Sequence, residues 1–187
     1  MFRTIVVAVD GTRTSSRALA AAIGLAKDQK ASLHVVHVID ELVMASMVDP
    51  SGVGVAQYVG TMLESLAKVG RKVVADAERV ASKDVANVKA EVVSSRGQSV
   101  ATVILRYSKR VGADVIVLGT HGRRGIGRLV MGSDAETVVR EATVPVLLVR
   151  NPTAQRKAPA PKKTAKSAAA DRRSLRAQRG VLERGAG

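Results

Sequence analysis

A glycine-rich stretch late in the chain has the residue types that hold a phosphate group. Its glycines follow the spacing Gly119-x2-Gly122-x9-Gly132, and Ser133 comes next, at the start of a segment with helical period. Glycine lets the backbone approach a phosphate closely, and the first turn of a helix adds N–H groups that lack a partner within the helix. The stretch therefore predicts an anion-binding loop in which the Ser133 hydroxyl donates to a phosphate oxygen.

Ser133 also has a purely structural interpretation. It could be the N-cap of the following helix, with Glu136 three residues later completing a capping box. A hydroxyl at a helix start can serve the helix and a ligand together. The residue types therefore leave both roles open.

Five short β-rich apolar runs must position this loop, and they alternate with segments of helical period. The runs are Thr4–Val9, Ser32–Val38, Val88–Val93, Asp114–Leu118 and Pro145–Val149. This alternation is typical of parallel strands joined by crossover helices. The Val88 run alternates with charged residues and Pro145 opens the last run, so both are predicted edge strands. The predicted fold class is α/β: a five-stranded parallel open sheet, Rossmann-like, with helices on both faces.

Apolar stripes at helical spacing mark the faces that should pack on the sheet. The predicted stripes are Leu19, Ala22, Ile23 and Ala26; Val100, Val103, Ile104 and Tyr107; Ala135, Val138, Val139 and Ala142; and, on a longer helix over 57–81, Val59, Met62, Leu63, Leu66 and Val73. Residues 40–54, between the second strand and the long helix, contain turn signals and are predicted to form a loop.

The carboxyl ends of the first and fourth strands are the expected place of the site. Open parallel sheets bind ligands where the strand order reverses, because the loops diverge there and leave a crevice. If these two strands flank that point, Asp10-Gly11-Thr12 meets the loop that begins at Gly119. Both loops are small, polar or rich in glycine, as a crevice requires.

The charge of the chain is concentrated at its C-terminus. Of the net +14, residues 151–187 carry +8, with ten Lys and Arg against two acidic residues, and residues 1–150 carry the remaining +6. Pro, Ala, Lys and Arg dominate after Arg150, which predicts a disordered basic tail after a domain over 1–150. The tail is either a solubilising extension or a segment that binds nucleic acid or another anionic surface through its cations.

Composition excludes several other classes of protein. The chain has no cysteine, which rules out disulfides and thiolate metal sites, and its 2% aromatic content argues against stacking platforms for nucleic acid. No apolar run is long enough for a membrane span or a signal peptide, so a cytoplasmic location is expected. His34 and His37 should point to opposite faces of their strand, so no histidine metal site is predicted.

Four segments, in order, resemble the ATP-binding type of universal stress protein. They are Val7-Ala-Val-Asp10-Gly-Thr, His37-Val-Ile-Asp40, the spacing from Gly119 to Ser133, and Val144-Pro-Val-Leu-Leu-Val149. The resemblance covers about residues 1–150. It implies an adenine nucleotide α hydrolase-like fold, ATP as a regulatory ligand in a stress response, and a homodimer paired through the last strand.

The resemblance also implies roles for individual residues. Asp10 would bind the ribose, Ala8 would line the base pocket, and the backbone at Val38 would read the adenine edge. Gly119 would lie against the ribose. The phosphates would be held by Gly122, Gly132 and Ser133, with Asp134 directly beside them.

Asp134 raises a question about charge, because a carboxylate close to a phosphate repels it unless a divalent cation lies between them. Asp134 either points away or helps to hold Mg²⁺. The chain lacks a Gly-x4-Gly-Lys-[Ser/Thr] loop and a recognisable residue to position water, so no catalytic residue is assigned. We expect at most slow ATPase or autophosphorylation activity. The alternative function is a dimeric interaction module without enzymatic activity, whose tail binds nucleic acid or an anionic surface.

Overall fold

The structure is a computed structural model that describes residues 1–41, 55–120 and 131–150. Met1–Asn151 form one compact unit. Several predictions fall outside the described residues: most of the loop over 40–54, the position of Gly122, and the basic tail over 151–187.

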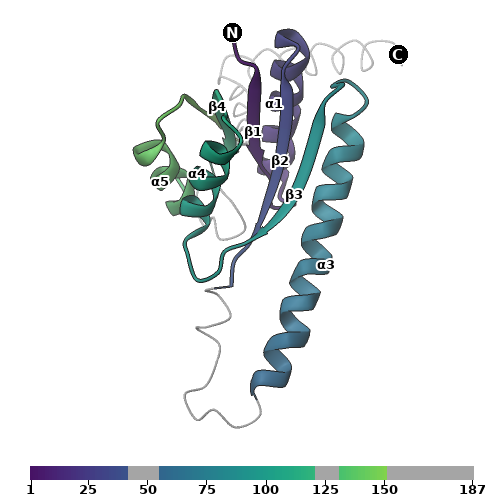
Figure 1. Cartoon of the computed structure of the whole chain (residues 1–187), viewed down its shortest axis with the longest axis vertical. Coiled ribbons are helices and arrows are strands. Elements are labelled where there is room, and N and C mark those ends of the chain that lie inside the picture. Colours follow the sequence, from purple (N-terminus) through teal and green to yellow (C-terminus); the bar gives the residue numbers. More distant parts are fainter. Residues whose placement is uncertain (42–54, 121–130, 151–187) are drawn as a thin grey trace, which may run out of the picture. The chain divides into compact units, whose positions relative to one another are not determined.

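Five parallel strands form the predicted open sheet (Figure 1). They are β1 (Thr4–Ala8), β2 (Ser32–Ile39), β3 (Val88–Ser94), β4 (Val115–Gly119) and β5 (Val146–Val149). The order across the sheet is β3-β2-β1-β4-β5, so the two predicted edge strands are confirmed and the order reverses between β1 and β4. Each strand agrees with its predicted run to within one residue at either end.

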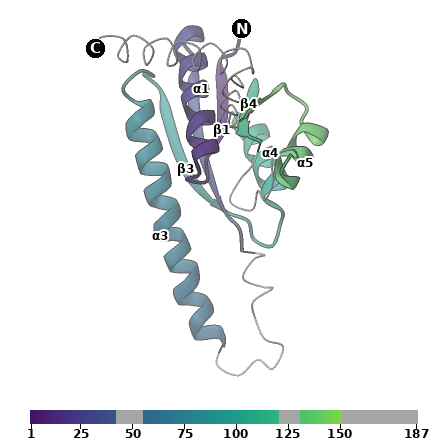
Figure 2. The same cartoon turned by 180° about the vertical axis from the view of Figure 1, so that it is seen from behind.

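Helices cover both faces of the sheet, as Figures 1 and 2 show from opposite sides. One layer contains α1 (Arg13–Gln29) and α3 (Val55–Ala81), and the other contains α4 (Val100–Arg110) and α5 (Ser133–Glu141). In the central strand β1, Ile5 and Val7 pack toward the first layer, whereas Val6 packs toward the second. This two-sided burial explains why the central runs are apolar without alternation.

Two of the predicted stripe residues do not face the sheet. The side chains of Met62 and Val139 are each 44% exposed, so their predicted inward orientation is wrong. On α3 the buried positions are Gly70, Val74, Ala77 and Ala81, and the predicted stripe residue Val73 packs against the same core. This part of the helix contacts β2 and β3. Among the described residues, no helix is long and apolar enough to cross a bilayer.

Candidate functional site

The loop after β1 is held in shape by its own polar groups. Asp10 Oδ1 accepts a hydrogen bond from the Thr12 N–H at 2.9 Å, and Gly11 adopts φ 82°, a conformation that favours glycine. Thr12 is the N-cap of α1, and its Oγ1 accepts from the Ser15 N–H at 3.2 Å. The predicted ribose-binding carboxylate therefore stands on a loop whose backbone is fixed.

Gly119 has a packing role at the end of β4. A methyl group added there would lie 2.8 Å from Thr14 Cγ2 and 3.3 Å from the Thr14 carbonyl carbon. Such distances force neighbouring atoms to move, so only glycine lets α1 approach the strand this closely. Sequence reasoning assigned Gly119 to a ligand and missed Thr14, which no motif marks.

One backbone hydrogen bond joins the ends of the glycine loop, and another links its start to β5. The Thr120 N–H donates to the Val149 carbonyl at 3.0 Å, and the Gly132 N–H donates to the Thr120 carbonyl at 2.9 Å. The start of α5 therefore lies beside the carboxyl end of β4. Gly122 and the loop arginines, Arg123, Arg124 and Arg128, lie within 121–130, outside the described residues.

The start of α5 differs from the predicted capping box. Gly132 is the N-cap, with φ −64° and ψ 146°, and no side chain caps the helix; Ser133 is its first helical residue. The interpretation of Ser133 as an N-cap paired with Glu136 is therefore wrong. Ser133 is exposed, while Asp134 is half-buried in the first turn. A helix N-terminus without a side-chain cap keeps N–H groups that can donate hydrogen bonds to an anion.

Apolar side chains lie on the same edge of the sheet. Ala8 and Val38, both half-buried, pack with Met131 against the cluster that contains Leu118. The β1–β2 register ends at Ala8 and Val36, so β2 continues past β1 before it ends at Ile39. Met131 lies at the candidate site and was not assigned from the sequence, although its position directly before Gly132 was a usable signal.

The predicted site residues within the described ranges therefore gather at the carboxyl ends of β1, β2 and β4. Asp10 follows the end of β1, Gly119 ends the neighbouring strand β4, and Gly132 brings the start of α5 to the same edge. The edge combines a fixed carboxylate, a helix N-terminus and an apolar floor, which are the groups that a sugar, an anion and a base require.

The histidines do not share a site. His37 Nδ1 lies 2.7 Å from the Val9 carbonyl, and its ring faces Gly70 of α3, whereas His34 Nδ1 lies 3.4 Å from the Tyr107 hydroxyl of α4. The prediction that their side chains point to opposite faces is confirmed. Within residues 1–41, 55–120 and 131–150, no three His, Cys, Asp or Glu side chains group as a metal site would require.

The strand order and the loops at its reversal define a Rossmann-like α/β protein. The universal stress protein family model matches residues 1–150, and the chain belongs to this family. It is 34% identical over 151 residues to the universal stress protein YxiE of Bacillus subtilis, covering 80% of this chain and all of that protein.

Solved structures give the same result. A universal stress family protein from Burkholderia pseudomallei is 32% identical with a TM-score of 0.62, over 78% of this chain and 94% of that one. Two structures below 25% identity share the fold. The Archaeoglobus fulgidus universal stress protein in complex with dAMP has 23% identity, TM-score 0.55 and coverages of 79% and 97%. A universal stress protein in complex with cAMP has 20% identity, TM-score 0.58 and coverages of 80% and 97%.

Proposed function

We propose that the protein binds ATP at the carboxyl ends of β1 and β4 as a regulatory ligand in a stress response. The observation that carries the proposal is the hydrogen bond from the Gly132 N–H to the Thr120 carbonyl. It places the start of α5 beside the point where the strand order reverses. Relatives of this fold solved with dAMP and with cAMP support an adenine nucleotide as the ligand class.

The proposed site residues, all of which except Gly122 are among the described ones, fit the parts of this ligand. The Asp10 carboxylate accepts hydrogen bonds from the ribose hydroxyls, and the base lies on the apolar surface around Ala8 and Val38, where the Val38 backbone reads the adenine edge. Gly119 lies against the ribose. The phosphates bind the start of α5 through Gly132, the exposed Ser133 hydroxyl and the Gly122 backbone.

The negative charge of Asp134 opposes the binding of a triphosphate unless a cation compensates it. Asp134 occupies the first turn of α5 with Glu136, where two carboxylates suit the helix dipole but oppose an incoming phosphate. Oxygen ligands from Asp134 and from the phosphates suit Mg²⁺. We therefore expect Mg²⁺ to strengthen ATP binding.

The ligand acts by selecting a conformation. Binding of the ligand stabilises one arrangement of residues 121–130, and a partner protein recognises the resulting surface without any chemical step.

An assembly through β5 is part of the proposal, because β5 is an edge strand and its Leu147 side chain is 40% exposed. The cytoplasmic location and the binding of nucleic acid by the tail stay predictions.

Calorimetric titration with ATP, with and without Mg²⁺, tests the proposal. Ser133→Ala is a clean variant, because no hydrogen bond of this exposed hydroxyl stabilises the described fold. Loss of one charge-assisted hydrogen bond should weaken binding by about tenfold. The matched control is Ser82→Ala, another exposed serine, which follows the end of α3 and should bind like the wild type.

Two outcomes of these titrations would contradict the proposal. Equal affinities for wild type and Ser133→Ala would remove α5 from the phosphate site. Failure of the wild type to bind ATP with or without Mg²⁺ would overturn the nucleotide proposal itself. Gly122→Val adds a second variant whose side chain blocks backbone approach, and circular dichroism shows whether it keeps the fold.

A further inference from the structure

A groove runs along the α4 side of the edge strand β3. Lys89, Glu91 and Val93 share this side, because their register partners on β2 are His34, Val36 and Val38, which face α4. Two adjoining hollows of about 350 Å³ and about 400 Å³ lie between the strand and the helix. We call this feature the β3–α4 groove.

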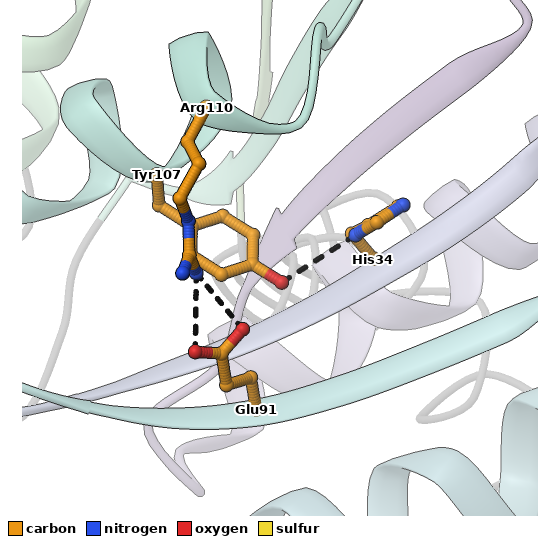
Figure 3. Close-up of polar contacts among 4 residues, drawn as sticks. All are labelled: His34, Glu91, Tyr107 and Arg110. Carbon is orange, nitrogen blue, oxygen red and sulfur yellow. Dashed lines mark hydrogen bonds and ion pairs between the residues drawn. The ribbon is translucent and has the colours of Figure 1, made fainter.

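Four side chains form a fixed bridge between the two hollows (Figure 3). Arg110 lies over the Tyr107 ring at 4.8 Å and donates to both oxygens of Glu91 at 2.9 and 3.1 Å. The Tyr107 hydroxyl lies 3.4 Å from His34 Nδ1, with the two rings edge to face. Burial, and next the Glu91 charge, raise the pKa of Tyr107 to about 12, so the bridge keeps a neutral phenol.

Because Arg110 pairs with Glu91 in the bridge, the other cations leave the groove with a net positive charge. The lining residues include Lys89, Arg96, Arg106 and Arg110 as cations, against Glu91 as the one carboxylate. Within the described parts of the chain, Arg96, Arg106 and Lys89 make no ion pair. Glu41 lies just past the end, where its carboxylate accepts from the Ser94 hydroxyl. Four cations thus exceed the two carboxylates along one groove.

The floor of the larger hollow is apolar. Half-buried Val93 on β3 provides the apolar surface that a ligand can contact, and Val103 and Tyr107 of α4, which are only 1% and 4% exposed, lie beneath it as its support. From Lys89 to Ser94 the strand extends about 17 Å, which an extended segment of about six residues would match. Cations at the rim and apolar groups on the floor favour a ligand that carries carboxylates beside an apolar side chain.

We propose that the β3–α4 groove binds an extended acidic segment of a partner protein. Carboxylates of the segment pair with Arg96 and Arg106 at one end and with Lys89 at the other, and an apolar side chain enters the hollow over Val93 and Val103. The groove lies on β3, at the edge opposite β5, and needs no nucleotide. The groove is therefore a second binding surface, separate from the proposed nucleotide site.

Nucleic acid fits the groove less well. A nucleic acid strand carries a phosphate at every nucleotide, so one of its charges would face Glu91 at the centre of the groove, whereas a peptide can place its carboxylates at the two ends. The Tyr107 ring is buried and covered by Arg110, so it offers no face on which a base could stack. A protein carboxylate, in contrast, can pair with the peripheral arginines while its neighbouring side chain fills the apolar floor.

Fluorescence anisotropy with a labelled heptapeptide of alternating Glu and Leu tests the proposal on the full chain without nucleotide. The groove variant combines Arg96→Gln with Arg106→Gln, and the matched control combines Arg71→Gln with Lys72→Gln, two exposed cations on α3. At about 0.15 M salt, the groove variant should lose at least about tenfold in affinity, and the control should stay within about twofold.

Two further ligands make the result specific. A heptapeptide with Ser in place of Leu keeps the charge but not the apolar groups, and should bind about tenfold more weakly. Equal losses in the groove and control variants would assign the peptide to nonspecific charge, including that of the tail, and overturn the proposal. The proposal also fails if the wild type does not bind the Glu-Leu peptide, or if the groove variant loses affinity for a short labelled single-stranded DNA and not for the peptide.

Discussion

The two candidate sites of this protein are built from different kinds of groups. The carboxyl-end site consists of backbone groups and small residues, such as Gly119 and Gly132, at places where strands end and a helix begins. The charged rim of the β3–α4 groove consists of long side chains on the surfaces of a strand and a helix. The first site shares its residues with the packing of the fold, whereas the second can change its chemistry with little effect on stability.

The largest expected effect tests the shared role of the carboxyl-end site. Gly119→Ala places a methyl group 2.8 Å from Thr14 Cγ2, so α1 and β4 must separate, and we expect a loss of about 1–3 kcal/mol in the free energy of unfolding. Chemical denaturation measures it. Gly24→Ala is the matched control, because its methyl group meets no atom within 4 Å and should stabilise α1 by about 0.5–1 kcal/mol.

An unchanged stability in Gly119→Ala would separate the two roles and leave this glycine to the ligand alone. A loss of stability together with a loss of ATP affinity would show one residue serving both.

A smaller effect is expected in the groove. Arg110 and Glu91 form a two-bonded ion pair, but their side chains remain 58% and 47% exposed, so solvent screens the interaction. A double-mutant cycle with Arg110→Ala and Glu91→Ala should give a coupling energy of about 0.5–1 kcal/mol. A coupling well above this range would mean that the groove residues, like those of the carboxyl-end site, also stabilise the fold.

The smallest change concerns pH. Burial, and next the positive charge of Lys89, lower the pKa of His34 in the folded protein, with Arg110 acting in the same direction and Glu91 against it. As the pH falls below about 6.5, the unfolded chain takes up this proton first, so stability is lost between that pH and the folded pKa. The wild type should therefore lose more stability than His34→Gln between pH of about 7.5 and about 5. Equal losses in the two proteins would show that other groups carry the pH dependence.

Most of the fold was readable from the sequence because parallel strands buried on both faces leave continuous apolar runs. The edge positions of β3 and β5 also had local signals, in the alternation around Glu91 and in Pro145. The helix faces were less certain. Met62 fits the apolar stripe of α3 by spacing, but it lies away from the residues that pack on the sheet, so spacing alone could not place it.

The two candidate sites also differed in how far the sequence could predict them. The glycine spacing and Asp10 predicted where loops meet, since the carboxyl ends of parallel strands lie at one edge. The cap of α5 was misassigned by one residue, because Gly132 and Ser133 are both acceptable N-caps by type. The groove carried no local signal: His34, Glu91 and Tyr107 come together only through the β2–β3 register and the placement of α4.

The two backbone bonds at Thr120 have a consequence for how such proteins diversify. They join β4 to β5 and to the start of α5 through residues outside 121–130, so we expect this arrangement to tolerate changes in the length of that segment. Doubling the length of a closed loop adds only about 0.6 kcal/mol of entropic cost. Under the proposed function, replacing this segment would change which ligands and partners the protein binds while β4, β5 and α5 keep their arrangement.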